Sequence, residues 1–194
     1  MSDWPAFADW PAFADSLARR IARALGDVRA RLDAPSGELE LHPTAGAWSN
    51  LEIAEHVALV NRYLLILADK IDAKSRARLA RGRAAPAEPS SIAHLEQLAS
   101  RAFTWMSPVH MLPSGRATAR EIASELDAQA ARCAALLAAA RHGEGALHRI
   151  RMSVVEGDDR LDMYQFLAVI ALHAERHVRQ MERNEQAHSH RRSR

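Results

Sequence analysis

The chain has 194 residues, 48% of them hydrophobic and 26% charged, with 26 Lys or Arg, 24 Asp or Glu and 10 His. This length and composition suit one folded domain and exclude a collagen-like, low-complexity or wholly disordered protein. The single cysteine, Cys133, excludes an internal disulfide framework and a Cys-rich zinc module. No segment approaches the ~20 apolar residues of a membrane-spanning helix. Because the first residues do not form a secretory signal, we expect a cytoplasmic location.

The positive charge is concentrated in two places along the chain. Three of the 26 basic residues lie at 186–194, so residues 1–185 carry 23 basic and 24 acidic groups. A second basic cluster lies at 70–83. Because neither cluster is accompanied by stacking aromatic residues or a recognition helix, we do not expect nucleic-acid binding. We predict a single domain over 1–185, followed by a basic, disordered tail at 186–194.

The N-terminal segment contains a duplicated hexad. The sequence Asp-Trp-Pro-Ala-Phe-Ala occupies 3–8 and again 9–14. This period matches no solenoid repeat, and we assign it no function. Apolar residues then recur at intervals of three and four over 12–32, which predicts an amphipathic helix. Pro35 and Gly37 end the pattern.

The second predicted helix has the clearest start signal in the chain. Ser49 and Glu52 have the spacing of a capping box, in which each side chain accepts a hydrogen bond from a backbone N–H of the other residue. An apolar stripe then continues for five turns to Ile71. The pattern dissolves before the proline-containing segment 81–91, which is predicted to be a linker.

The segments that connect the later helices are predicted to be short or irregular. A short helix is expected over about 92–103, followed by an apolar but proline-interrupted segment at 105–113. A weak alternation over 149–155 indicates a short extended excursion.

Two more capping patterns open the third and fourth long helices. Thr118 and Glu121 precede an apolar stripe that closes at His142-Gly143, a common C-terminal signal. Asp162 precedes a last helix that reaches about residue 183. Four long amphipathic helices and no convincing run of strands predict an all-α fold. We expect an antiparallel four-helix bundle with a long excursion between its second and third helices.

Three of the ten histidines interrupt apolar stripes and are predicted to point into the bundle. His56 lies in line with inward residues of the second helix, at about 100° per residue. His173 and His177 are four residues apart on the last helix, so their rings leave the same face. A lone core histidine is usually satisfied by hydrogen bonds, whereas three converging imidazoles form a ligand set for a divalent ion. The other seven histidines fall in loops, caps, short segments or the tail.

The sharper catalytic motifs are not present. His173-Ala-Glu-Arg-His177 is not the H-E-x-x-H of zincins, and Glu175, about 200° around the helix from His173, points away from the pair. A ferritin-like di-iron site requires two Glu-x-x-His pairs, which this sequence does not have. Cys133 continues an apolar stripe and is predicted to be a packing thiol.

The two segments that carry these histidines resemble the DinB-like (DinB/YfiT-type) metalloprotein family. In that family a Trp-Ser start precedes a helix with one ligand histidine, and the last helix carries an H-x-x-x-H pair. Here Trp48-Ser49 precedes His56, and His173 and His177 supply the pair. The order of these motifs and the chain length fit a family bundle of four helices.

The resemblance implies a divalent metal, commonly nickel or zinc, held by His56, His173 and His177 with water completing the shell, and often a homodimer. Some relatives use the metal to bind a low-molecular-weight thiol and transfer it to an electrophile, and others resemble hydrolases. We therefore expect a metal-dependent thiol transferase or hydrolase acting on a small-molecule substrate, with the segment 105–113 shaping a mostly apolar pocket. The alternative is a non-catalytic metal-binding or stress-response interaction bundle.

Overall fold

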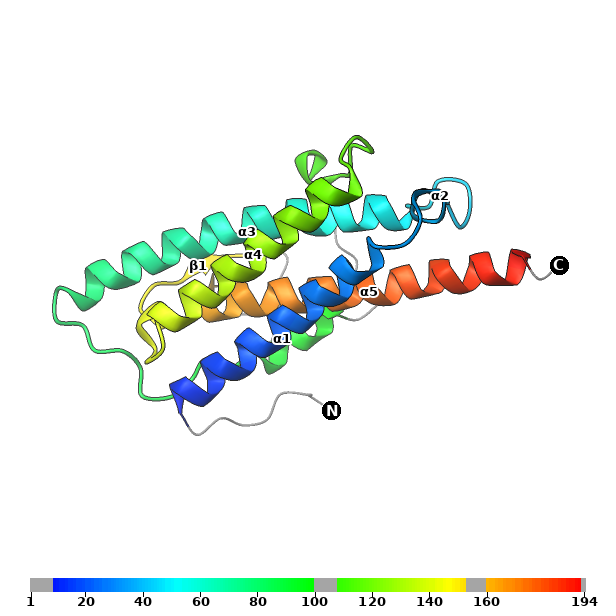
Figure 1. Cartoon of the computed structure of the whole chain (residues 1–194). Helices are drawn as coiled ribbons and strands as arrows, with labels where there is room; N and C mark the ends of the chain where they lie inside the picture. The colour runs from blue at the N-terminus through cyan, green and yellow to red at the C-terminus, as the bar shows by residue number, and fades with distance from the viewer. Residues whose placement is uncertain (1–8, 100–107, 153–159, 193–194) are drawn as a thin grey trace.

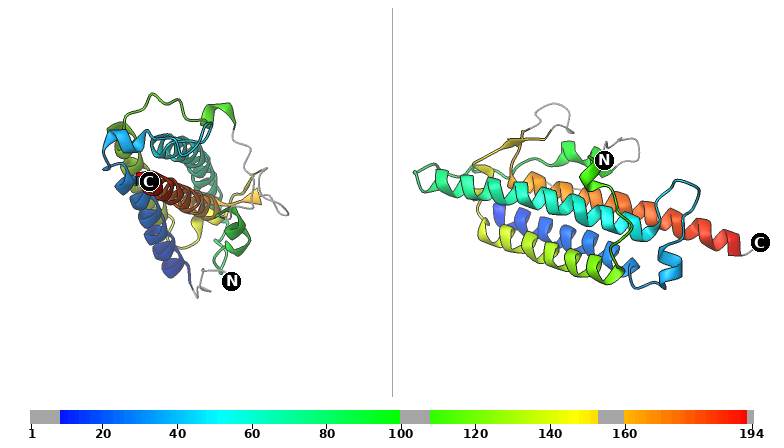
Figure 2. Two further views of the ribbon diagram at one scale, coloured as in Figure 1. Left: turned by 90° about the vertical axis from the view of Figure 1, so that its right-hand side faces the viewer. Right: turned by 90° about the horizontal axis from the view of Figure 1, so that it is seen from above.

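The computed structural model describes residues 9–99, 108–152 and 160–192. Its four long helices are α1 (Trp10–Arg31), α3 (Asn50–Leu79), α4 (Ala119–Ala139) and α5 (Met163–Arg192). Helix α1 packs against α4 and α5, and α3 packs against the same two helices, so the four surround one core. The helices lie in two layers, with α1 beside α4 in one and α3 beside α5 in the other (Figures 1 and 2). The predicted all-α fold is confirmed.

The remaining elements are short. They comprise helix α2 (Ser36–Leu39), the 3-10 helices η1 (Ala93–Ala99), η2 (Val109–Met111) and η3 (Glu144–Ala146), and the antiparallel strands β1 (Ile150–Arg151) and β2 (Arg160–Leu161). The helix predicted over 92–103 is therefore a 3-10 helix in its described part, and its end lies outside the described residues. Strand β1 lies within the extended excursion predicted at 149–155, whose last residues are also outside them.

The predicted capping boxes are confirmed by their hydrogen bonds. Both capping boxes, Ser49 with Glu52 and Thr118 with Glu121, have their two reciprocal bonds. Helix α1 begins two residues earlier than its stripe predicts, because the Asp9 carboxylate accepts a hydrogen bond from the N–H of Ala12 at 2.8 Å. The second copy of the hexad therefore forms the N-cap and first turn of α1, and the first copy at 3–8 lies outside the described residues.

Asp162 caps α5 from inside the core. Its side chain accepts a hydrogen bond from the N–H of Gln165 at 3.1 Å, and its N–H donates to the Gln165 side chain at 3.1 Å. The carboxyl is fully buried and also accepts a bond from the Ser90 hydroxyl. Burial raises the pKa of this carboxyl above its usual value, against the opposing effect of these hydrogen bonds.

We expect Asp162→Ala to lower the free energy of unfolding by about 2 kcal/mol, because it removes the cap and leaves the Ser90 hydroxyl without its acceptor. Asp162→Asn keeps an acceptor oxygen and should lose less. Urea unfolding of the two variants and the wild type measures both effects. Equal losses for Ala and Asn would show that the cap is not the source of the effect.

The N-terminal half of α5 is the centre of the core. Every residue from Met163 to Ala174 is buried, since the sequence there is apolar around the whole helix and neighbours cover it on all sides. None of the helices in the described part of the chain is both long and apolar enough to cross a membrane.

The C-terminal half of α5 is longer than predicted. Residues 186–192, which lie within the predicted tail, are helical, and this end of α5 projects beyond the other helices (Figure 1). The helix is anchored past residue 183 because Asn184 donates to the backbone oxygen of Trp48 at 3.0 Å and Glu185 pairs with Arg31 at 3.3 Å. These contacts join residues far apart in sequence, so the local sequence pattern near the end of α5 does not predict them.

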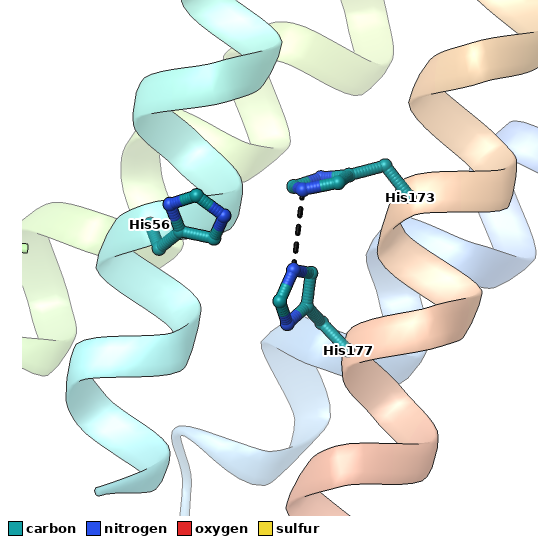
Figure 3. Close-up of side chains that lie close together, drawn as sticks. All are labelled: His56, His173 and His177. Atoms are coloured by element: carbon teal, nitrogen blue, oxygen red, sulfur yellow. Dashed lines mark hydrogen bonds between the residues drawn. The ribbon is translucent and has the colours of Figure 1, made fainter. Parts of the chain in front are cut away.

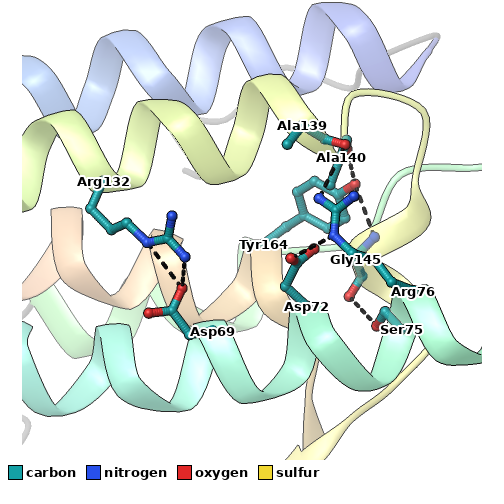
Figure 4. Close-up of polar contacts among 9 residues, drawn as sticks. All are labelled: Asp69, Asp72, Ser75, Arg76, Arg132, Ala139, Ala140, Gly145 and Tyr164. Carbon is teal, nitrogen blue, oxygen red and sulfur yellow. Dashed lines mark hydrogen bonds and ion pairs between the residues drawn. The ribbon is translucent and has the colours of Figure 1, made fainter.

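A polar network closes the end of the bundle where α5 begins (Figure 4). The Tyr164 hydroxyl donates to the backbone oxygen of Ala140, just past the end of α4, and accepts a bond from the N–H of Gly145. Ser75 of α3 donates to the oxygen of Gly145 at 3.4 Å. Helix α4 ends at Ala139, slightly before the predicted stop, and Gly143 lies in the left-handed region with φ of 91°. The network holds the turn after α4 against α3 and α5.

Candidate metal centre

The structure brings together the three histidines that the sequence singled out. His56 projects from α3 toward His173 and His177 on α5 (Figure 3). All three side chains are buried, with exposures of 2%, 1% and 7%. Each ring has one nitrogen that could bind a shared metal ion, and these three nitrogens all lie within 4.8 Å of one another. Helix packing thus joins a residue of the second long helix with a pair more than 100 positions later.

The spacing of the His173 and His177 Nε2 atoms fits a single small ion. The Nε2 atoms of His173 and His177 are 3.1 Å apart. Two nitrogens bound at 2.0–2.1 Å to one tetrahedral zinc ion lie about 3.3 Å apart, and at right angles around an octahedral ion about 3.0 Å apart. The ring of His56 meets the other two edge-on, with centroids 5.1 and 4.9 Å away. The three histidines therefore form a group that could hold one metal ion.

Two of the rings, those of His56 and His177, are oriented by hydrogen bonds at Nδ1. His56 Nδ1 donates to the backbone oxygen of Met111 at 2.7 Å, and His177 Nδ1 donates to Gln180 Oε1 at 3.0 Å. Both partners are acceptors, so in each neutral ring the proton lies on Nδ1 and Nε2 keeps its lone pair. Bonds of this kind fix the tautomer and direction of metal-binding histidines.

The short contact between His173 and His177 has a consequence for the metal-free protein. Since His177 Nε2 is an acceptor, the 3.1 Å contact requires His173 Nε2 to carry a proton and donate it. An ion bound by both Nε2 atoms takes the place of this proton. Because the neutral ring has a single proton, that proton then lies on Nδ1, so metal uptake changes the tautomer of His173.

Burial keeps the three imidazoles neutral. Desolvation lowers the pKa of His56 below its usual value, against the opposing bond to Met111. It lowers the pKa of His177 to about 3, with further lowering by His56 and the Arg176 charge. The pKa of His173 is lowered well below its usual value by burial and then by His177 and His56. Neutral imidazole is the form that binds a metal ion.

We expect the metal-free protein to lose stability as the pH falls from about 6.5 toward 3. The unfolded chain takes up protons on these histidines near pH 6.5, whereas the native site resists protonation, so the stability is fully present only above pH 6.5. The loss approaches about 1.4 kcal/mol per pH unit for each buried histidine. Urea unfolding at pH 7 and pH 5 measures it. A His177→Gln variant should show a shallower dependence, and an unchanged wild-type stability would contradict the burial argument.

Glu175 and Cys133, which the sequence analysis did not assign to the metal site, make their contacts elsewhere, as predicted. The Glu175 carboxylate makes a two-point ion pair with Arg20 of α1, at 2.6 and 2.8 Å, on another side of α5. Cys133 is fully buried in α4, and burial raises the pKa of its thiol to about 12. Neither residue supplies a base or a nucleophile to the histidines.

The segment expected to line the mouth of the bundle reaches the site. The Met111 backbone oxygen bonds His56, so residues 108–113 lie beside the centre, while residues 105–107 are outside the described part of the chain. On another side, the Trp48 ring packs on His56 with centroids 4.9 Å apart. The roles of Met111 and Gln180 were missed from the sequence. The spacing of Gln180, three residues after His177, was a usable signal, but nothing in the sequence pointed to Met111.

The comparisons with known proteins agree with the geometry. The family model described as the DinB superfamily matches residues 20–181, a range that includes all four long helices in whole or part and all three histidines. Neither the comparison with curated proteins nor that with solved structures gives a match. The chain belongs to the DinB superfamily.

Proposed function

We propose that this protein is a divalent-metal-dependent enzyme with zinc or nickel held by His56, His173 and His177. The observation that carries the proposal is the convergence of three buried imidazoles, each with one ring nitrogen within 4.8 Å of those of the other two. A structural zinc site usually has four protein ligands, whereas a catalytic site has three and keeps a position for water or substrate. Among the described residues, no carboxylate or thiolate joins the three histidines in this group.

The chemistry follows from the donor set. A divalent ion lowers the pKa of a bound water or thiol and so supplies a nucleophile at neutral pH. The protein orients His56 through Met111 and His177 through Gln180, and the Trp48 ring packs on His56. We propose thiol transfer from a low-molecular-weight thiol to an electrophile, or hydrolysis, as the reaction.

The wider expectations from the resemblance are part of the same proposal. The ring of contacts among α1, α3, α4 and α5 supports the antiparallel four-helix bundle. A homodimer, a small thiol partner and a cytoplasmic location remain predictions.

Metal analysis is the first test of this function. Protein stripped with a chelator, reloaded with zinc or nickel and dialysed should retain about one ion per chain. The loaded protein is then screened for thiol consumption with a panel of small thiols and electrophiles, and for hydrolysis. If the stripped protein takes up neither ion, the proposal is wrong.

A non-catalytic metal-binding bundle is the second candidate. It is favoured by the low exposure of the rings, between 1% and 7%, which leaves the ligands themselves little contact with solvent. Retention of one ion without turnover of any thiol, electrophile or ester in the screen would support this candidate over the enzyme.

A further inference from the structure

Glu55, the neighbour of His56 on α3, is a buried acid that holds a turn of the chain far away in sequence. Its side chain is 7% exposed. One carboxylate oxygen accepts a hydrogen bond from the Ser114 hydroxyl at 2.6 Å, and the other accepts one from the N–H of Gly115 at 3.0 Å. These two hydrogen bonds satisfy both oxygens of the buried side chain.

The backbone conformation of the turn at Ser114 and Gly115 allows both groups to bond Glu55. Gly115 has φ of 67°, in the left-handed region where glycine is favoured. The Ser114 hydroxyl also accepts a bond from the N–H of Arg116 at 3.2 Å, which closes the turn locally. The Gly115 N–H and the Ser114 hydroxyl therefore point together at one carboxylate.

The same stretch of chain carries the carbonyl that orients His56. The Met111 backbone oxygen lies three residues before Ser114 and accepts the bond from His56 Nδ1. Two consecutive residues of α3 thus hydrogen-bond to one segment: His56 bonds Met111, and Glu55 bonds Ser114 and Gly115. The outer face of the segment is open to solvent, since Val109 is 84% exposed and Leu112 is 42% exposed, while the Met111 side chain is buried in the core.

We propose that Glu55 is a positioning residue for the metal centre: by holding Ser114 and Gly115 it keeps the Met111 carbonyl on His56 Nδ1, and so keeps His56 Nε2 directed at His173 and His177. This inference rests on the proposed function for its consequence, which is metal affinity. The orientation of His56 is independent of any ion and is measured separately.

The affinity test compares Glu55→Ala with a matched control. Glu121 is also a helix carboxylate that accepts a hydrogen bond from one hydroxyl and one from a backbone N–H, but both come from Thr118 at 2.8 Å and neither involves the 108–115 segment or the histidines. Chelator competition should show zinc binding weakened about 10- to 100-fold in Glu55→Ala, the range for loss of an outer-shell partner. Glu121→Ala should stay within about twofold of wild type.

Two more variants separate positioning from folding. Glu55→Gln can still accept from Gly115 and bond Ser114, so it should recover most of the zinc affinity. Ser114→Ala removes one of the two bonds and leaves the buried carboxylate in place, and it should weaken binding several-fold even if Glu55→Ala does not fold. Wild-type zinc affinity in both Glu55→Ala and Ser114→Ala would overturn the proposal.

A second readout uses the metal-free protein. In ¹⁵N-edited NMR spectra, His56 of the wild type should be the Nδ1–H tautomer, and Glu55→Ala should show a mixture of tautomers while Glu121→Ala does not. If the wild type binds no metal but Glu55→Ala still shows the mixture of tautomers, the proposed function is refuted and the role of Glu55 is supported. A wild type that binds metal, with no tautomer shift in Glu55→Ala, would refute the role of Glu55 alone.

Discussion

Replacement of His173 by alanine should abolish stable metal binding. His173 is the least exposed of the three ligands at 1%, and its Nε2 lies 3.1 Å from that of His177, so no other side chain can take its place without repacking α5. Two imidazoles alone do not complete a zinc or nickel site in a protein. Metal content measured after dialysis should fall from about one ion per chain to nearly none. His177→Ala and His56→Ala should give the same result.

The control for this experiment is His42→Ala. His42 is an exposed histidine in the loop before α3, where its Nδ1 bonds the backbone oxygen of Ala47 at 2.7 Å. This variant should retain its ion, which would show that loss of an arbitrary histidine is not enough. Full retention of the ion by folded His173→Ala would contradict the three-histidine centre.

Gly143→Ala should produce the largest loss of stability among the glycine-to-alanine changes in the described part of the chain. A Cβ at Gly143 would lie 2.5 Å from Cε2 and 2.6 Å from Nε1 of Trp10, and φ of 91° is strained for alanine. Trp10 cannot readily move away, because its ring is 4.7 Å from that of Tyr164 and its Nε1 donates to the oxygen of Pro86 at 2.7 Å. Strain and overpacking together should cost about 3 kcal/mol or more.

The matched control for the Gly143 variant is Gly46→Ala. Gly46 has a similar φ of 79°, but nothing lies within 4 Å of the position of its Cβ. This variant therefore isolates the backbone strain, which should cost about 1 kcal/mol. Urea unfolding of both metal-free variants measures the difference. Equal losses would show that the contact with Trp10 contributes nothing.

The starts of the long helices were the most predictable features of the fold. Ser49, Thr118 and Asp162 were recognised as caps because a capping side chain bonds a backbone group only two or three residues away, so the signal is contained in one short window. The ends of the helices were less predictable. Helix α5 runs on to Arg192 because Asn184 and Glu185 contact α1 and the start of α3, partners that lie more than 100 residues away in sequence.

In the metal centre too, features set by local sequence were predictable and features set by distant contacts were not. His56, His173 and His177 were identifiable because each interrupts an apolar stripe, and periodicity alone shows which face of a helix a residue occupies. The acceptor of His56 was not identifiable, because a backbone carbonyl has no sequence signature and Met111 is 55 residues from His56. Glu55 has no distinguishing sequence pattern, and only its burial and its bonds to Ser114 and Gly115 reveal its role.

The sequence by itself therefore determined the helices, their caps and the inward direction of three histidines, since these depend on hydrogen bonds and side-chain spacing within a few turns. Only the tertiary structure decided that α3 and α5 bring the three rings to the same level, with nitrogens within 4.8 Å. It also decided which groups orient those rings. The physical reason is that packing, burial and long-range hydrogen bonds depend on how distant segments meet, and a local pattern does not contain that information.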